Sequence, residues 1–237
     1  MQRYEKKSKN AVLFTEISHL SPLVKVLSFE KTQDSLGFLL TYSYLCTLIM
    51  AKNEEKTNEQ FEQTLAECRA LFEKKLHDYG ASWRILRPQS LTDQLFIKAK
   101  RIRSLEIKKE SLVGEGIRPE FVALINYGIV GLIQIYHGFS DTVDITNAEA
   151  LGLYDKYAQE ALALMKRKNH DYDEAWRGMR VSSYTDFILT KIERIKEIEN
   201  LGGDTLVSEG IDSNYMDIIN YAVFGVIKLT EAARSKR

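Results

Sequence analysis

The chain has 237 residues, 44% of them hydrophobic and 28% charged, which fits a folded protein with one large or two small cores and excludes a disordered chain. Lysine plus arginine and aspartate plus glutamate are equal at 33 each, so the net charge gives no strong signal for nucleic acid and none for an anionic membrane. The two cysteines lack metal-binding or disulfide spacing, which fits a reducing cytoplasm.

Residues 1–49 precede the repeated part of the chain and share no segment with it. Their apolar run, residues 36–50, is shorter than the roughly 20 residues that span a bilayer, and we expect neither a membrane helix nor a signal peptide. Met50 is followed by a polar stretch that resembles a protein start. Two interpretations stay open: residues 1–49 are upstream translation, or they form a real extension that packs on the core.

An internal repeat organises the rest of the chain. The segment His77–Arg84 recurs as His170–Arg177, 93 residues later, and the match continues through two further helical segments with one inserted residue. A duplication of this length predicts two copies of one supersecondary unit. We assign repeat 1 to residues 57–137, a connection to residues 138–150 and repeat 2 to residues 151–231.

Each repeat is expected to hold three helices. Capping signals mark the starts of the first and second helices, at Thr57-x-x-Gln60 and Ser90-x-x-Asp93 in repeat 1 and at Thr146-x-x-Glu149 and Ser183-x-x-Asp186 in repeat 2. The third helices begin near Arg118 and Asp212 and are apolar nearly all round, so we expect them at the centre. The predicted fold class is all-α: two tandem three-helix repeats form one helical bundle, packed through the third helices about a pseudo-twofold axis.

A lysine lies in the centre of the apolar stripe of each second helix. These residues are Lys98 and Lys191, and an arginine, Arg101 or Arg194, follows each of them at the edge of the same stripe. A buried ammonium group needs a partner, because leaving its charge unpaired is strongly unfavourable. Two interpretations stay open: the lysine and arginine converge on an anionic ligand, or they form salt bridges to the glutamates at positions 115 and 209.

Asparagine and aromatic side chains complete the repeated polar set. Asn126 and Asn220 lie within the apolar third helices, where each either fixes helix register by hydrogen bonds or contacts a base or a metal. The tryptophans of the repeated loop either attach the loop to the core or stack on a base. The nucleotide-binding candidates are Tyr79, Trp83, Arg84, Arg87, Lys98, Arg101 and Asn126 in repeat 1, and Tyr172, Trp176, Arg177, Arg180, Lys191, Arg194 and Asn220 in repeat 2.

These motifs resemble those of a known family. The segment from Lys75 to Trp83, then Lys98-x-x-Arg101-Ile102, Glu115-Gly116-Ile117 and Ile125-Asn126-Tyr127 are similar to the first of the nucleotide-modification-associated domains, which phages and bacteria carry and which also occurs in a tandem form. The resemblance covers residues 57–231. It implies an all-helical domain linked to nucleotide or DNA modification.

The helical layout of that family is distantly like that of the all-α nucleoside triphosphate pyrophosphohydrolases, which hold Mg²⁺ with acidic pairs on facing helices. By this analogy Glu115, Glu209 and Asp217 are the candidate Mg²⁺ ligands. The family commonly has an acidic pair ahead of the Asn-Tyr motif, and of the four corresponding positions here only Asp217 is acidic.

Three functions remain open. The chain is a nucleotide-processing enzyme like the pyrophosphohydrolases, a non-catalytic nucleotide-binding module, or a helical protein-interaction module in which the repeated polar residues are structural. The expected ligand is a small-molecule nucleotide, and the expected state is either a monomer that imitates a dimer or a homodimer. The lack of a signal peptide points to the cytoplasm.

Overall fold

The computed structural model describes residues 35–202 and 210–235, and the chain divides into two units, Met1–Met50 and Ala51–Arg237. Of the first unit, the structure describes the beginning of helix α3, where Tyr44, Leu48 and Ile49 are exposed. The described residues contain α-helices and short 3-10 helices and no strand, so the predicted all-α class is confirmed. The interpretation of Met50 as the initiator stays a prediction.

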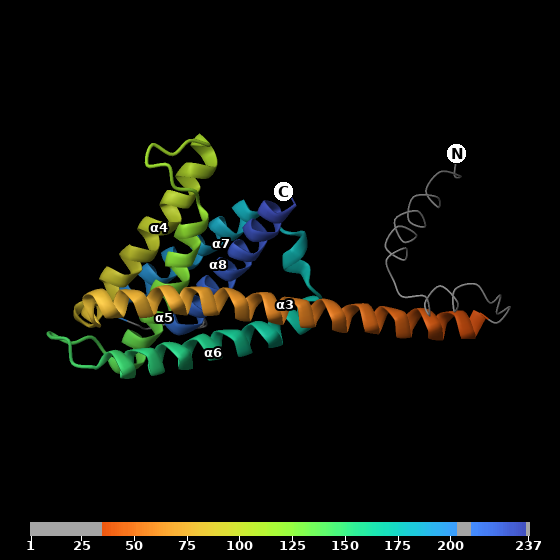
Figure 1. The fold of residues 1–237 in the computed structure, drawn as a ribbon, viewed down its shortest axis with the longest axis horizontal. Coiled ribbons are helices and arrows are strands. Elements are labelled where there is room, and N and C mark those ends of the chain that lie inside the picture. The colour runs from red at the N-terminus through yellow and green to blue at the C-terminus, as the bar shows by residue number, and fades with distance from the viewer. Residues whose placement is uncertain (1–34, 203–209, 236–237) are drawn as a thin grey trace. The chain divides into compact units, whose positions relative to one another are not determined.

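Each repeat has the same order of elements (Figure 1). Repeat 1 contains the end of α3 (Ser35–Tyr79), the 3-10 helix η1 (Ser82–Ile85), α4 (Pro88–Lys108) and α5 (Arg118–His137). Repeat 2 contains α6 (Asn147–Tyr172), η2 (Ala175–Gly178), α7 (Val181–Asn200) and α8 (Ile211–Arg234). Counterparts in the two repeats are 93 residues apart as far as α4 and α7, and 94 residues apart in α5 and α8.

Three of the four expected capping boxes are wrong. The helix α3 runs through Thr57, whose buried hydroxyl instead donates a hydrogen bond to Glu174. The helices α4 and α7 begin at Pro88 and Val181, two residues before the expected serines, and have no side-chain cap. The box at Thr146 is confirmed, because its hydroxyl accepts from the Glu149 amide while the Glu149 carboxylate accepts from the Thr146 amide.

The central contact joins the two third helices, α5 and α8. It is reciprocal: Gly131 on α5 faces Tyr215 on α8, and its counterpart Gly225 on α8 faces Phe121 on α5, the counterpart of Tyr215. A Cβ at Gly131 would lie 2.0 Å from Tyr215 Cε1, and one at Gly225 would lie 2.9 Å from Phe121 Cε1. In a twofold interface each contact occurs twice, with the two partners exchanged between the two halves. The two glycine contacts follow this pattern.

A second reciprocal contact joins α4 to α7. Thr92 donates a hydrogen bond to Glu199 at 2.7 Å, and its counterpart Thr185 donates one to Glu106 at 3.0 Å. Burial raises the pKa of both glutamates. The two repeats are therefore related by a pseudo-twofold axis that runs through both helix pairs.

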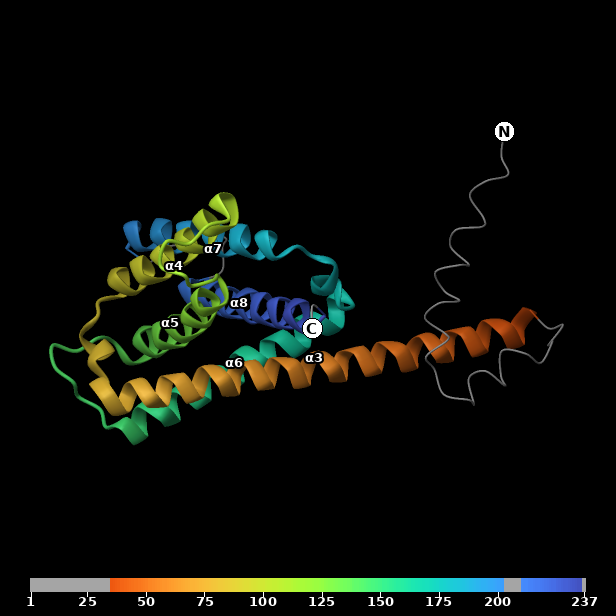
Figure 2. The same cartoon turned by 45° about the horizontal axis from the view of Figure 1, so that its top comes forward.

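The first helices of the two repeats lie side by side. Figures 1 and 2 both show the part of α3 after Met50 running beside α6. Arg69 forms a bidentate pair with Asp155, and Lys166 pairs with Glu62 at 3.1 Å. These ion pairs join the first helix of repeat 1 to the first helix of repeat 2.

One helix among the described residues, Arg118–His137, is long and apolar enough to cross a membrane. Most of its apolar window, 72%, is buried inside the protein. Burial of this extent is that of a central core helix.

Candidate functional site

Two lysines from different helices meet one buried carboxylate in repeat 2. Lys191 of α7 places its Nζ 2.8 Å from Oδ2 of Asp217 on α8, and Lys168 of α6 places its Nζ 2.5 Å from Oδ1. The Asp217 side chain is 8% exposed, whereas the side chains of Lys191 and Lys168 are 29% and 44% exposed. The carboxylate therefore holds two ammonium groups that remain open to solvent.

An aromatic side chain lies one helical turn from each member of this charged group: Tyr172 on α6, Phe187 on α7 and Tyr221 on α8. The ring centroids of Phe187 and Tyr221 are 5.4 Å apart. Burial raises the pKa of Tyr221; Asp217 and Tyr172 raise it further, and the two lysines lower it. We call the three charged and three aromatic residues the repeat-2 site.

The corresponding cluster of repeat 1 contains two basic and two acidic side chains. Arg101 donates to Glu115 at 3.1 Å and also to Glu120, while the Lys98 ammonium lies 3.2 Å from Glu120 Oε2 as an ion pair rather than as an aligned hydrogen bond. Hydrogen bonding to Glu115 raises the pKa of Arg101. We call these four residues the repeat-1 cluster, and its opposite charges balance.

The expected salt bridge to Glu115 is confirmed for Arg101, but the lysines pair with other acidic residues. Lys98 pairs with Glu120, and Lys191 pairs with Asp217. The residue of repeat 1 that corresponds to Asp217 is Ala123, not Glu120. Glu120 lies one turn earlier on α5, and its longer side chain reaches Lys98, the counterpart of Lys191. Glu209 lies outside the described residues.

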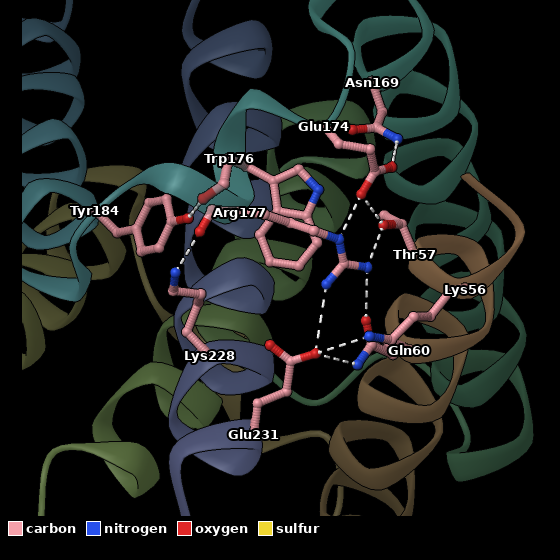
Figure 3. Close-up of polar contacts among 10 residues, drawn as sticks. All are labelled: Lys56, Thr57, Gln60, Asn169, Glu174, Trp176, Arg177, Tyr184, Lys228 and Glu231. Atoms are coloured by element: carbon pink, nitrogen blue, oxygen red, sulfur yellow. Dashed lines mark hydrogen bonds and ion pairs between the residues drawn. The ribbon is translucent and has the colours of Figure 1, made fainter. Parts of the chain in front are cut away.

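The predicted arginines of the repeated loops are bound by protein groups. Arg84 is buried and pairs with both carboxylate oxygens of Asp144 at 2.8 and 3.0 Å. Arg177 donates to Glu174, Thr57 and Gln60 at 2.6 to 2.9 Å and lies 3.4 Å from Glu231 (Figure 3). These contacts give both arginines a structural role, and their role as nucleotide ligands stays a prediction.

The loop of repeat 2 has an unusual backbone conformation, which the hydrogen bonds around Arg177 and Glu174 stabilise. Asp173 and Glu174 have positive φ angles of 46° and 58°, which residues with side chains rarely adopt. The Glu174 carboxylate accepts hydrogen bonds from Thr57, Asn169 and Arg177, and Lys228 donates one to the Arg177 carbonyl at 2.5 Å (Figure 3). The loop that follows Tyr172 is therefore fixed from three helices.

The remaining loop candidates differ in burial. Trp176 is buried and stacks on Phe224 with ring centroids 4.4 Å apart, which favours attachment of the loop to the core. Trp83 is half-buried, and its ring lies 6.3 Å from that of Phe72. The other candidates on the loops are exposed and do not join either charged cluster, namely Tyr79, Arg87 and Arg180. Arg194 pairs with Glu197 at 3.1 Å.

The two asparagines have different surroundings. Oδ1 of Asn126 accepts a hydrogen bond from the hydroxyl of Tyr154 at 2.7 Å. Oδ1 of Asn220 is buried and has no hydrogen-bond donor within the described parts of the chain. Nδ2 of Asn126 is also buried and has no acceptor within the described parts of the chain, so the two amides differ in which atom is bonded. The interpretation as a core amide describes the oxygen of Asn126 and leaves that of Asn220 unexplained.

The predicted Mg²⁺ ligands do not form a metal site in the described residues. Residues 35–202 and 210–235 contain no group of three or more histidine, cysteine or acidic side chains that could hold a metal ion. Glu115 and Asp217 belong to different repeats, and each is already bonded to basic side chains. Mg²⁺ requires several oxygen ligands around one point, which these two carboxylates do not provide.

Sequence reasoning missed three residues that the structure brings into the two clusters: Glu120, Lys168 and Phe187. Lys168 belongs to the repeated Lys-x-His-Asp-Tyr motif and precedes Tyr172 by one turn, so its spacing was a usable signal. Glu120 and Phe187 correspond to Asn214 and Gln94 in the other repeat, and a search restricted to repeated residues overlooks them.

Comparison with known proteins gives one match. A family model described as nucleotide modification associated domain 1 matches residues 75–135 and again residues 168–229, together more than half of the chain. Each match contains the second helix and most of the third helix of one repeat, and the second match contains all six residues of the repeat-2 site. Neither the curated proteins nor the solved structures gave a match.

Proposed function

The chain belongs to the nucleotide modification associated domain 1 family, and on that basis we propose that it binds a nucleotide at the repeat-2 site. The phosphates would lie on the ammonium groups of Lys168 and Lys191, and the base would lie against the aromatic residues one turn away. The observation that carries this proposal is the pair of lysines held by one buried aspartate.

The lysine pair is suited to binding an anion because the buried Asp217 carboxylate holds both ammonium groups in place. Each ammonium group has three N–H donors and lies within hydrogen-bonding distance of one Asp217 carboxylate oxygen. Holding two flexible lysines in one place before a ligand arrives lowers the entropy that binding costs. Both side chains are partly exposed, so a phosphate can approach from the solvent side.

The aromatic residues supply the other half of a nucleotide site. Tyr172 and Phe187 are exposed large side chains, and Tyr221 is half-buried beside Phe187. Stacking of a base on such rings contributes about 1–3 kcal/mol per base and tolerates different bases. The rings of Phe187 and Tyr221 lie 5.4 Å apart, and Tyr172 is near enough to Tyr221 to raise its pKa. The three aromatic residues therefore lie in one region of the repeat-2 site.

Repeat 1 has tyrosines at the positions of Tyr172 and Tyr221, namely Tyr79 and Tyr127, but it lacks the excess of positive charge and the third aromatic residue. Its lysine and arginine are balanced by Glu115 and Glu120, and the position of Phe187 is taken by Gln94. We therefore assign the ligand to repeat 2 and a structural role to the repeat-1 cluster. No metal-dependent step belongs to this proposal, since the described carboxylates do not fit Mg²⁺. A cytoplasmic location is part of it, because free nucleotides occur there.

Thermal unfolding in the presence of nucleoside mono- and triphosphates, ribo and deoxy, with and without Mg²⁺, tests the proposal. A ligand at about 100 times its Kd stabilises the folded state by about 2.7 kcal/mol, which raises the Tm of a protein of this size by roughly 5–10 °C. The absence of a shift with every nucleotide would contradict the proposal. Release of pyrophosphate in the same samples would establish the pyrophosphohydrolase hypothesis, and binding without release would favour the non-catalytic module.

A further inference from the structure

The oxygen of the repeated asparagine has a hydrogen-bond donor in one repeat and none among the described residues in the other. Asn126 on α5 accepts a hydrogen bond from the Tyr154 hydroxyl, and Tyr154 lies on α6, the first helix of the other repeat. The contact therefore crosses between the repeats, and the pseudo-twofold axis requires a corresponding one between α3 and Asn220 on α8.

The residue that corresponds to Tyr154 is Phe61. It precedes Tyr154 by 93 residues on the uninterrupted helix α3, and it is fully buried. Its ring packs against Phe224 with centroids 6.0 Å apart, one helical turn from Asn220. Phe61 thus lies where the symmetry places it, but phenylalanine has no hydroxyl to donate.

Asn220 consequently has a carbonyl oxygen without a donor in the part of the chain that the structure describes. Buried polar groups in folded proteins are nearly always hydrogen-bonded, and exceptions commonly mark a place for water, an ion or a ligand. As whole residues, Asn220 is 5% exposed and Asp217 is 6% exposed. Asp217 lies three residues earlier on the same face of α8.

We propose that Oδ1 of Asn220 accepts a hydrogen bond from the nucleoside part of the ligand bound at the repeat-2 site. This inference rests on the proposed function. The donor must be an O–H or N–H group, because an ionised phosphate has none to offer. A sugar hydroxyl and an amino group of the base share this chemistry, and Asn220 is then a specificity-determining residue rather than part of the anion site.

Restoring the missing hydroxyl by Phe61→Tyr tests the inference. The new hydroxyl donates to Asn220 as Tyr154 does to Asn126, so the Tm without ligand rises, and nucleotide affinity falls roughly tenfold, which corresponds to about 1.4 kcal/mol. Inorganic tripolyphosphate, which carries no nucleoside, binds both proteins equally. The matched control is Tyr154→Phe, which lowers the Tm and leaves nucleotide affinity unchanged.

A second pair of variants covers the case in which Phe61→Tyr does not fold. Asn220→Leu removes the acceptor and weakens nucleotide but not tripolyphosphate binding, whereas Asn126→Leu leaves both unchanged. In the wild type, a preference for ribonucleotides over deoxyribonucleotides would identify a sugar hydroxyl as the donor. A preference for adenine and cytosine over uracil would identify an amino group.

The outcomes separate this inference from the proposed function. If Phe61→Tyr and Asn220→Leu leave nucleotide affinity unchanged, or weaken nucleotide and tripolyphosphate binding equally, the role of Asn220 is overturned and the anion site stands. If neither nucleotide nor tripolyphosphate binds the wild type, the proposed function fails and the role of Asn220 fails with it.

Discussion

The two repeats share one helical framework and differ in how they use it. In repeat 1 the repeated lysine and arginine are balanced by Glu115 and Glu120, and the repeated asparagine is bonded to Tyr154. In repeat 2 the repeated lysine and a second lysine share Asp217, and the asparagine oxygen has no donor in the described chain. Duplication copies packing and ligand sites alike, so only such differences distinguish a structural residue from a functional one.

The largest expected effect concerns the axis between the repeats. Gly131→Ala would place a Cβ 2.0 Å from the ring of Tyr215, whereas Gly225→Ala would place one 2.9 Å from that of Phe121. We expect Gly131→Ala to lower the free energy of unfolding by about 3 kcal/mol and Gly225→Ala by about 1 kcal/mol. Denaturant unfolding measures both. Gly152→Ala, with no neighbour within 4 Å, is the control and should not destabilise the fold.

A smaller effect is expected from the acidic residues of the repeat-1 cluster. Glu120 is 4% exposed and serves both Lys98 and Arg101, whereas Glu115 is 57% exposed and serves Arg101 alone. Glu120→Ala should cost about 2 kcal/mol of unfolding free energy, because it leaves two partly buried cations without their shared partner. Glu115→Ala should cost at most about 0.5 kcal/mol. Equal effects of the two variants would show that Glu120 is not the centre of the cluster.

The smallest expected effect is a pH dependence at the contact between α4 and α7. Burial raises the pKa of Glu106 and Glu199 in the folded state above the unfolded value near 4.5. The folded state then binds protons more readily, so this contribution to stability is present at low pH and is lost as the pH rises through the folded pKa. Glu106→Gln and Glu199→Gln should each raise the unfolding free energy at pH 7 slightly, by up to about 0.5 kcal/mol.

Thermal unfolding of these two variants between pH 4 and pH 8 measures the effect. The two glutamines should behave alike, since the two glutamates are related by the pseudo-twofold axis and each accepts from an equivalent threonine. Stabilisation by only one of the two variants would break the symmetry inferred for this contact. A loss of stability in both at pH 7 would contradict the direction given for their pKa values.

The sequence was sufficient to predict the duplication, the all-α class and the central position of the third helices, because apolar periodicity and repetition are local signals. It was insufficient at Thr57, where a capping signature lies inside a longer helix. The Thr57 hydroxyl is bound by Glu174 and Arg177, more than one hundred residues away, and no local pattern carries that information.

For the site, the sequence indicated that Lys98 and Lys191 need partners but not which partners they have. Glu120 compensates from one turn away for the acidic residue missing at Ala123, and only the helix geometry reveals this. The difference between Phe61 and Tyr154 is visible in the sequence. Its consequence for Asn220 is not, because it depends on a contact between helices of different repeats.

The central claim is that repeat 2 binds an anionic nucleotide and repeat 1 does not, and two matched variants test it most directly. Lys191→Met and Lys98→Met each remove the repeated lysine from a carboxylate that keeps a second basic partner, so their effects on folding should be similar. Isothermal titration with the nucleotide that gives the largest Tm shift should show at least a roughly tenfold loss of affinity for Lys191→Met and wild-type affinity for Lys98→Met. Equal affinity of both variants, or a greater loss in Lys98→Met, would contradict the assignment.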